Sequence, residues 1–174
     1  CYTISPIHTF ESYVALGKTL EGMGCNSICI KDMAGIMSPQ VCYDLVSALK
    51  KEVNLPVYVH SHSTTGLGPM TLVKAVEAGA DGIDTAISIF SGGTSHPATE
   101  SLVYTLNEMG FDTGVNLKVC QKINDHFKPV QEKIKKALGD RVKNVVLSKR
   151  LSDSPSCIVV DENDPTLQME KMMR

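Results

Sequence analysis

Three short apolar segments decide the predicted fold: SICI at residues 27–30, VYV at residues 57–59 and GIDTAI at residues 82–87. They are rich in β-branched residues and recur at a regular interval, with helical patterns between them. Strands and helices that alternate at this spacing form right-handed βαβ units around a parallel sheet. The sequence therefore predicts an α/β fold.

The segment after the first strand shows a complete helix signature. Ser38 is a candidate N-cap, Pro39 suits the first turn, and apolar residues recur every four positions from Val41 to Val53. We expect this helix to lie on the sheet. An earlier helix over residues 9–23 is expected to end at Gly24 and to follow a strand at residues 1–4; we expect it to bury Tyr13, Leu16 and Leu20.

A longer helix is predicted from Asn116 to Gly139. Its apolar residues follow a 3-4-3-4 spacing that gives one stripe: Cys120, Ile123, Phe127, Val130, Ile134 and Leu138. The pattern then changes to strands at residues 142–147 and 157–160 and a final helix from Asp164. We predict two domains, residues 1–130 and residues 131–174, the second a small α+β piece.

The composition argues against several classes of function. The 174 residues include 17 Lys and Arg against 19 Asp and Glu, a net charge of −2, and 43% of them are hydrophobic. The absence of a basic block argues against nucleic acid as a partner. No apolar run approaches the roughly 20 residues of a membrane helix, and no export signal opens the chain. The six cysteines include no C-x-x-C pair, which favours a reduced, cytoplasmic protein.

Polar side chains gather where the predicted strands end. His60 and His62 are two apart in one strand, so both point to the same side and are able to reach one metal ion. Lys31 holds the matching place on the preceding strand, and the sequence GGTS at residues 92–95 follows the next one. Because loops after the carboxyl ends of parallel strands form the active site, we expect these groups to converge.

Each of these signals also has a purely structural interpretation. An H-x-H pair is common by chance, and a lysine at the end of a strand is usually solvated. The glycines before Thr94 are also compatible with a simple flexible turn, and Thr94 itself with a helix cap. His8, His96 and His126 are interpreted as loop or helix-face histidines.

Five motifs together carry a resemblance to a known family. They are YTISPIHT at residues 2–9, ICIKDMAG at 28–35, HSHSTTGL at 60–67, DTAIS at 84–88 and GGTSHPATES at 92–101. From residue 1 to about residue 128 the chain resembles the biotin-dependent carboxyltransferases, which include the oxaloacetate decarboxylase alpha subunit, pyruvate carboxylase and transcarboxylase. The resemblance implies the second half of a TIM (β/α)8 barrel, with parallel strands five to eight and their helices.

The resemblance also implies a site and its chemistry. Lys31, carbamylated by CO2, would join His60 and His62 as a ligand of Zn²⁺ or a similar transition ion. Thr94 would pass a proton between biotin and the enolate of pyruvate. Gly93 and Ser95, beside it, would contact substrate or cofactor. The implied partners are oxaloacetate or pyruvate and a biotinyl carrier domain.

The sequence departs from the family pattern in several places. The family's first barrel strand supplies an aspartate metal ligand, a glutamine and arginines, and we expect this chain to begin after all of them. His96 stands in place of a glutamine and Ala98 in place of a proline. A barrel takes about 250 residues, so we expect a fragment with weak or no activity, and exposed sheet edges that favour homo-oligomers.

The last part of the chain resembles a second family. ALGDRVKNV at residues 137–145, SKRLSDSPSCIVV at 148–160 and LQMEKMM at 167–173 are similar to the C-terminal domain of the bacterial 90-kDa heat-shock chaperone. This resemblance covers about residues 131–174. Two families in one chain imply a chimera. The alternative to a carboxyltransferase-derived fragment is thus a structural or interaction module with a chaperone-derived association segment and no catalysis.

Overall fold

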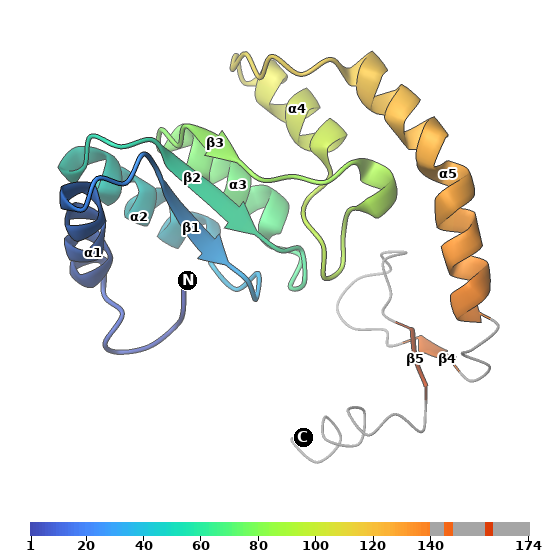
Figure 1. Cartoon of the computed structure of the whole chain (residues 1–174), viewed down its shortest axis with the longest axis horizontal. Coiled ribbons are helices and arrows are strands. Elements are labelled where there is room, and N and C mark those ends of the chain that lie inside the picture. The colour runs from blue at the N-terminus through green and yellow to red at the C-terminus, as the bar shows by residue number, and fades with distance from the viewer. Residues whose placement is uncertain (140–144, 148–158, 162–174) are drawn as a thin grey trace. The chain divides into compact units, whose positions relative to one another are not determined.

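A three-stranded parallel sheet forms the centre of the N-terminal part of the chain. The computed structural model describes residues 1–139, 145–147 and 159–161, and the chain divides into two compact units, residues 1–121 and residues 122–174. In the first unit, β1 (Ile28–Asp32), β2 (Val57–Ser61) and β3 (Gly82–Ile83) lie in the order β1-β2-β3 (Figure 1). The predicted α/β fold with a parallel sheet is confirmed.

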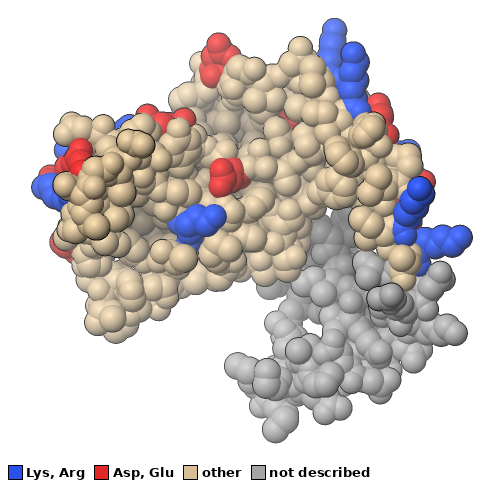
Figure 2. Space-filling view, in the orientation of Figure 1, with Lys and Arg blue, Asp and Glu red and all other residues tan. Residues whose placement is uncertain are grey.

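Helices cover one face of this sheet. The helices α2 (Pro39–Glu52) and α3 (Gly68–Glu77) lie behind the strands in Figure 1. Val57 and Val59 point into the core between them and are fully buried. Tyr58, between the two valines, points to the opposite face and is exposed. In Figure 2, which has the same orientation, uncharged atoms make up most of this open face.

Helix α2 follows its sequence signature closely. The Ser38 side chain accepts a hydrogen bond from the backbone N–H of Val41, and Pro39 occupies the first turn. Leu45 and Leu49, from the predicted four-residue repeat, are buried in the core. The periodicity of this segment therefore predicted both the helix and its buried face.

The helix before β1 corrects one prediction. Helix α1 (Phe10–Gly22) is capped by Thr9, but Leu16 is 55% exposed rather than buried. Its neighbour Gly17 is buried instead, and a Cβ atom there would lie 3.0 Å from Leu49 Cδ2. Because the glycine lets α1 approach α2 closely, the contact face centres on Gly17 and Leu16 points away from it.

Two predicted strands differ from the structure: one is absent and the other is shorter than expected. Residues 1–4 form no strand, although the backbone N–H of Tyr2 donates to the Lys31 carbonyl oxygen over 2.8 Å. The third strand ends at Ile83, because the chain beyond it bonds a later segment: Ala86 donates to Pro97 O over 3.0 Å. A short 3-10 helix (Ser88–Phe90) lies inside this connection.

Two further helices and one antiparallel pair of strands complete the described elements. Helix α4 (Thr99–Glu108) precedes α5 (Leu117–Gly139), whose end agrees with the prediction. In the second unit, β4 (Val145–Leu147) pairs antiparallel with β5 (Val159–Asp161). The helix predicted from Asp164 lies outside the described residues. None of the described helices combines the length and the apolar character that crossing a membrane requires.

Candidate metal centre

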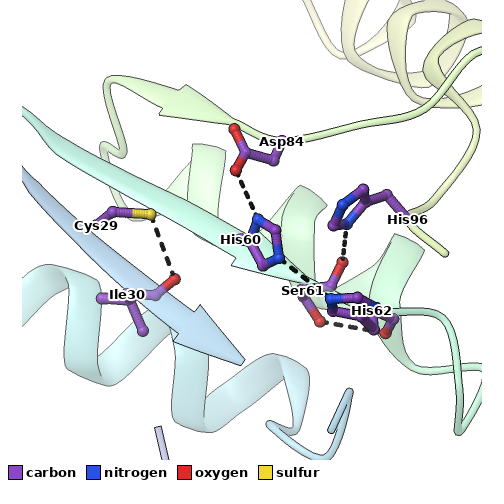
Figure 3. A network of polar contacts seen from close by, with 7 residues as sticks. All are labelled: Cys29, Ile30, His60, Ser61, His62, Asp84 and His96. Carbon is purple, nitrogen blue, oxygen red and sulfur yellow. Dashed lines mark hydrogen bonds and ion pairs between the residues drawn. The ribbon is translucent and has the colours of Figure 1, made fainter. Parts of the chain in front are cut away.

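Two histidines at the carboxyl end of β2 face each other. His60 is 8% exposed near the end of the strand, and His62 follows Ser61 directly after it. Their Nε2 atoms are 3.2 Å apart (Figure 3). The alternation of side chains along an extended segment, predicted from the H-x-H spacing, accounts for this approach.

An acidic side chain after β3 orients His60. The Asp84 carboxylate lies 2.7 Å from His60 Nδ1 (Figure 3), and the Asp84 backbone N–H donates to Val59 O. Burial lowers the pKa of His60, the hydrogen bond to Asp84 opposes this shift, and the charges of His96 and Lys31 add to the lowering. The lowered pKa favours the neutral form of His60, the form in which an imidazole binds a metal ion.

The loop after the 3-10 helix orients His62. The Thr94 carbonyl oxygen accepts from His62 Nδ1 over 2.5 Å, and Ser63 N donates to Ser95 O over 2.8 Å. Gly92 and Gly93 both have positive φ, 84° and 55°, which L-residues rarely adopt. We call residues 91–96 the 91–96 loop. Its two glycines let the chain fold back so that a carbonyl group points at the imidazole ring.

The same loop brings a third histidine into the site. His96 Nδ1 lies 3.0 Å from the Ser61 carbonyl oxygen, and its ring centroid is 4.3 Å from that of His60 and 4.7 Å from that of His62 (Figure 3). We call His60, His62 and His96 the histidine cluster. One ring nitrogen from each lies within 4.8 Å of the others.

The sequence interpretation of His96 as an ordinary loop histidine is corrected, because its ring lies with those of His60 and His62. The signal was present in the sequence, because His96 is the second residue after Thr94, in a loop predicted to converge on His60 and His62. The sequence signal for this third ring was the histidine at position 96 of that loop. The position of its ring depends on a hydrogen bond from the His96 side chain to the Ser61 carbonyl oxygen, which no spacing rule supplies.

The other predicted site residues lie on β1 and in the 91–96 loop. Lys31 pairs in register with His60 across β1 and β2, so both side chains point to the open face of the sheet. Within the described chain its ammonium group forms no ion pair. Thr94 is exposed and contacts His62 through its carbonyl group. Gly93 and Ser95 complete the 91–96 loop, Gly93 at its tight turn.

Asp32, next to Lys31, has a structural role. Its buried carboxylate accepts hydrogen bonds from the backbone N–H groups of Ile36 and Met37, at 3.0 and 3.1 Å, and from the Ser61 hydroxyl at 2.9 Å. These bonds fix the turn between β1 and α2 against the end of β2. Asp32 therefore points away from the histidine cluster.

The donor set of the cluster suits a transition ion. Imidazole nitrogen is a preferred ligand of Zn²⁺, Cu²⁺, Ni²⁺ and Fe²⁺, whereas Mg²⁺ and Ca²⁺ prefer oxygen. The three rings are close enough for one ion. Lys31, as an ammonium group, adds a positive charge that disfavours a cation. The residues present thus fit a metal ion of the transition series.

Comparison with known proteins places the chain in a family. The model of the HMGL-like family matches residues 7–126. The chain belongs to the HMGL-like family. Within this family it is 57% identical over 135 residues to a pyruvate carboxylase subunit of Methanocaldococcus jannaschii, a match that covers 78% of the chain and 24% of that protein.

Other HMGL-like relatives are carboxyltransferases. The methylmalonyl-CoA carboxyltransferase 5S subunit of Propionibacterium freudenreichii subsp. shermanii is 46% identical over 138 residues, which cover 78% of the chain and 27% of that subunit. The carboxyl transferase domain of Rhizobium etli pyruvate carboxylase, solved with pyruvate and biocytin, is similar with a TM-score of 0.73 and 34% identity. That match covers 75% of this chain and 23% of the solved chain.

These relatives confirm the predicted resemblance to carboxyltransferases and an α/β fold similar to that of the pyruvate carboxylase domain. The chain spans about a quarter of the length of the curated relatives named above. The predicted similarity of the tail is confirmed as well, because the Hsp90 protein family model matches residues 105–174. The two family matches overlap at residues 105–126, and the predicted boundary near residue 130 stays a prediction.

Proposed function

We propose that this chain carries the metal-binding part of a biotin-dependent carboxyltransferase. The reaction is carboxyl transfer between biotin and pyruvate, or the corresponding decarboxylation of oxaloacetate. The observation that carries the proposal is the approach of His60 and His62 at the carboxyl end of β2, in a chain whose relatives are named as pyruvate carboxylases. We assign the described sheet to strands six to eight of a TIM barrel and residues 1–4 to the position of strand five.

The metal ligands we propose are His60, His62 and a carbamylated Lys31. The neutral Lys31 amine would attack CO2, forming an N–C bond and releasing one proton, which converts a cation into an anionic oxygen ligand. The position of Lys31 in register with His60, free of an ion pair among the described residues, supports this. When bound, the divalent ion supplies a Lewis acid that polarises the keto group of the substrate.

Thr94 is the residue we propose for proton transfer. Its exposed hydroxyl both donates and accepts, as a shuttle between biotin and the enolate carbon requires. The hydrogen bond from His62 to the Thr94 carbonyl fixes the backbone of this residue beside the metal ligands. Gly93 and Ser95, in the same loop, are proposed to contact the keto acid or biotin on a carrier domain.

We expect weak or no turnover by this chain alone. Residues 1–139 contain no arginine, the side chain that binds a carboxylate with two parallel hydrogen bonds. The described sheet has three parallel strands, whereas a closed barrel of this type has eight. We propose that a cytoplasmic partner polypeptide of different sequence completes the site, because a second copy of this chain would bring the same residues 1–139 and again no arginine.

The test combines metal analysis with a decarboxylation assay. We expect near-stoichiometric transition metal in the purified chain and its loss in a His60→Ala/His62→Ala variant. Any metal-dependent decarboxylation of oxaloacetate above the rate of free metal should disappear in Lys31→Ala. A metal-free wild-type chain after loading with Zn²⁺ would contradict the proposal. A His126→Ala variant, whose histidine lies in α5, is the matched control.

The match to the Hsp90 protein model favours one alternative function. Residues 105–174 would then mediate association, and the histidine cluster would be a remnant without a metal ion. This alternative predicts a thermal stability that chelators do not change and self-association that is lost when residues 140–174 are removed. Sedimentation of the full and shortened chains, with and without chelator, separates the two functions.

A further inference from the structure

The three rings of the histidine cluster share one hydrogen-bonding pattern. Each ring directs Nδ1 at an oxygen that only accepts, namely the Asp84 carboxylate or the carbonyl oxygens of Ser61 and Thr94. Nδ1 of each ring must therefore carry the hydrogen atom. In a neutral imidazole with a hydrogen on Nδ1, Nε2 is an acceptor with a bare lone pair. The pattern thus prepares all three rings as Nε2 ligands.

The contact between His60 and His62 suits a positive charge between the two rings. Two bare Nε2 atoms 3.2 Å apart repel each other unless a proton or a metal ion lies between their lone pairs. With Zn–N bonds of about 2.0–2.1 Å, two ligands of a tetrahedral site are about 3.3–3.4 Å apart. The observed separation is therefore close to one edge of a tetrahedral site. Without a third ligand, a shared proton would account for it equally well.

His96 distinguishes a metal ion from a proton. A proton bridges two nitrogen atoms, whereas here a third ring packs against both of the others, with centroids 4.3 and 4.7 Å away. Its Nδ1 is held by the Ser61 carbonyl oxygen, in the strand that carries the other two rings. Three imidazoles oriented by carbonyl and carboxylate acceptors are the arrangement that protein zinc sites use.

We propose that His60, His62 and His96 form a three-histidine site for Zn²⁺ or a similar ion, which binds without modification of Lys31. Three neutral nitrogen ligands suffice for a zinc site whose fourth position is open. Lys31 then contributes at most the fourth ligand. The inference shares the metal ion with the proposed function but does not require carboxyl transfer, because metal binding is measured directly.

The test is a metal-affinity titration of the full chain in buffer free of CO2. Zn²⁺ is titrated in competition with a chromogenic chelator into the wild type and into His96→Gln, Lys31→Met and His8→Gln. Loss of an orienting residue around a metal ligand already costs about 10–100-fold in affinity. We therefore expect His96→Gln to weaken Zn²⁺ binding by at least about 100-fold. His8→Gln, outside the cluster, should leave it unchanged.

Two further results decide the role of Lys31 and the number of imidazoles. Lys31→Met should bind Zn²⁺ at least as tightly as the wild type, because it removes a repelling charge. X-ray absorption of the Zn²⁺-loaded wild type should show three imidazole ligands, a readout that does not depend on how any variant folds. The visible spectrum of the Co²⁺ form should change in His96→Gln and stay the same in His8→Gln.

Specific outcomes overturn the inference. Equal Zn²⁺ affinities for His96→Gln and the wild type, or two imidazoles by X-ray absorption, would remove His96 from the site while leaving His60 and His62 in the proposed function. Loss of binding in Lys31→Met or in CO2-free buffer would show that carbamylated Lys31 is indispensable. A wild-type chain that binds no Zn²⁺ would refute this site and the metal centre of the proposed function together.

Discussion

Replacing Gly35 with alanine tests how the turn after β1 supports the histidine cluster. Gly35 has φ +64°, and a Cβ atom there would lie 2.4 Å from the His62 carbonyl oxygen and 3.0 Å from the His62 carbonyl carbon. Both atoms belong to the main chain, so no side-chain rotation relieves the contact. The substitution must therefore move either the turn or the segment that carries His62.

The loss in free energy of unfolding caused by Gly35→Ala has two parts. The positive φ costs an L-residue about 1–2 kcal/mol. Forcing extra atoms into a tightly packed place adds about 1–3 kcal/mol. The turn cannot move freely, because Asp32 holds it by hydrogen bonds from Ile36 and Met37. We therefore expect Gly35→Ala to lower the free energy of unfolding by about 2–5 kcal/mol.

Gly66→Ala is the matched control. Gly66 also has a positive φ, 83°, in the connection between β2 and α3, but a Cβ atom there meets no heavy atom within 4 Å. It should cost only the backbone part, about 1–2 kcal/mol. Denaturant unfolding followed by far-UV circular dichroism gives both values, and Zn²⁺ titration of the same samples shows whether His62 has moved.

One result of comparing Gly35→Ala with Gly66→Ala would refute the packing argument. If Gly35→Ala is no less stable than Gly66→Ala and binds Zn²⁺ with wild-type affinity, the turn after β1 does not press on the His62 backbone. The close packing between this turn and the segment that carries His62 would then be an incorrect description of the site. If only the Zn²⁺ affinity falls, the main chain has adapted by displacing His62 without a large loss of stability.

Three further perturbations test other parts of the first unit. Asp84→Asn should weaken Zn²⁺ binding by about 10–100-fold, because it replaces the carboxylate that orients His60; a chelator competition titration measures this. Leu45→Ala should lower the free energy of unfolding by about 2–5 kcal/mol in denaturant, because Leu45 is fully buried. The hydrogen bond from Lys50 lowers the pKa of Asp81. The ionised form of Asp81 therefore stabilises the fold at pH values above the unfolded-state pKa. This stabilisation is lost as the pH falls through the folded-state pKa. Asp81→Asn should thus cost less than about 1 kcal/mol at neutral pH, and a pH series of unfolding curves should show this difference vanishing in acid.

The sequence predicted the local features of this fold well. The strands at residues 28–32 and 57–61 and the buried face of α2 follow from short-range patterns of apolar residues. The approach of His60 and His62 follows from the same rule, since residues two apart in an extended chain share a side. These features depend on backbone geometry that every strand or helix repeats.

The features that sequence reasoning missed depend on contacts between segments. Leu16 fits an apolar helical stripe, yet the close approach of α1 and α2 at Gly17 turns it toward solvent. The strand expected at residues 1–4 makes one backbone hydrogen bond to β1, too few for a ladder. The position of His96 depends on a loop that closes on Ser61. None of these contacts leaves a periodic signal.

The arrangement of the histidine cluster separates the proposed metal binding from the rest of the proposed reaction. Its three histidines come from the end of β2 and from the 91–96 loop, and the groups that orient them, Ser61, Asp84 and Thr94, lie in the same stretch of chain. The crossover through α3 therefore brings together a ligand set and its supporting hydrogen bonds by itself. In the proposed reaction an arginine fork would suit the keto-acid carboxylate, and residues 1–139 contain no arginine. It follows that metal affinity and turnover should respond independently: a partner that completes the barrel should raise the rate of oxaloacetate decarboxylation while changing the Zn²⁺ affinity little.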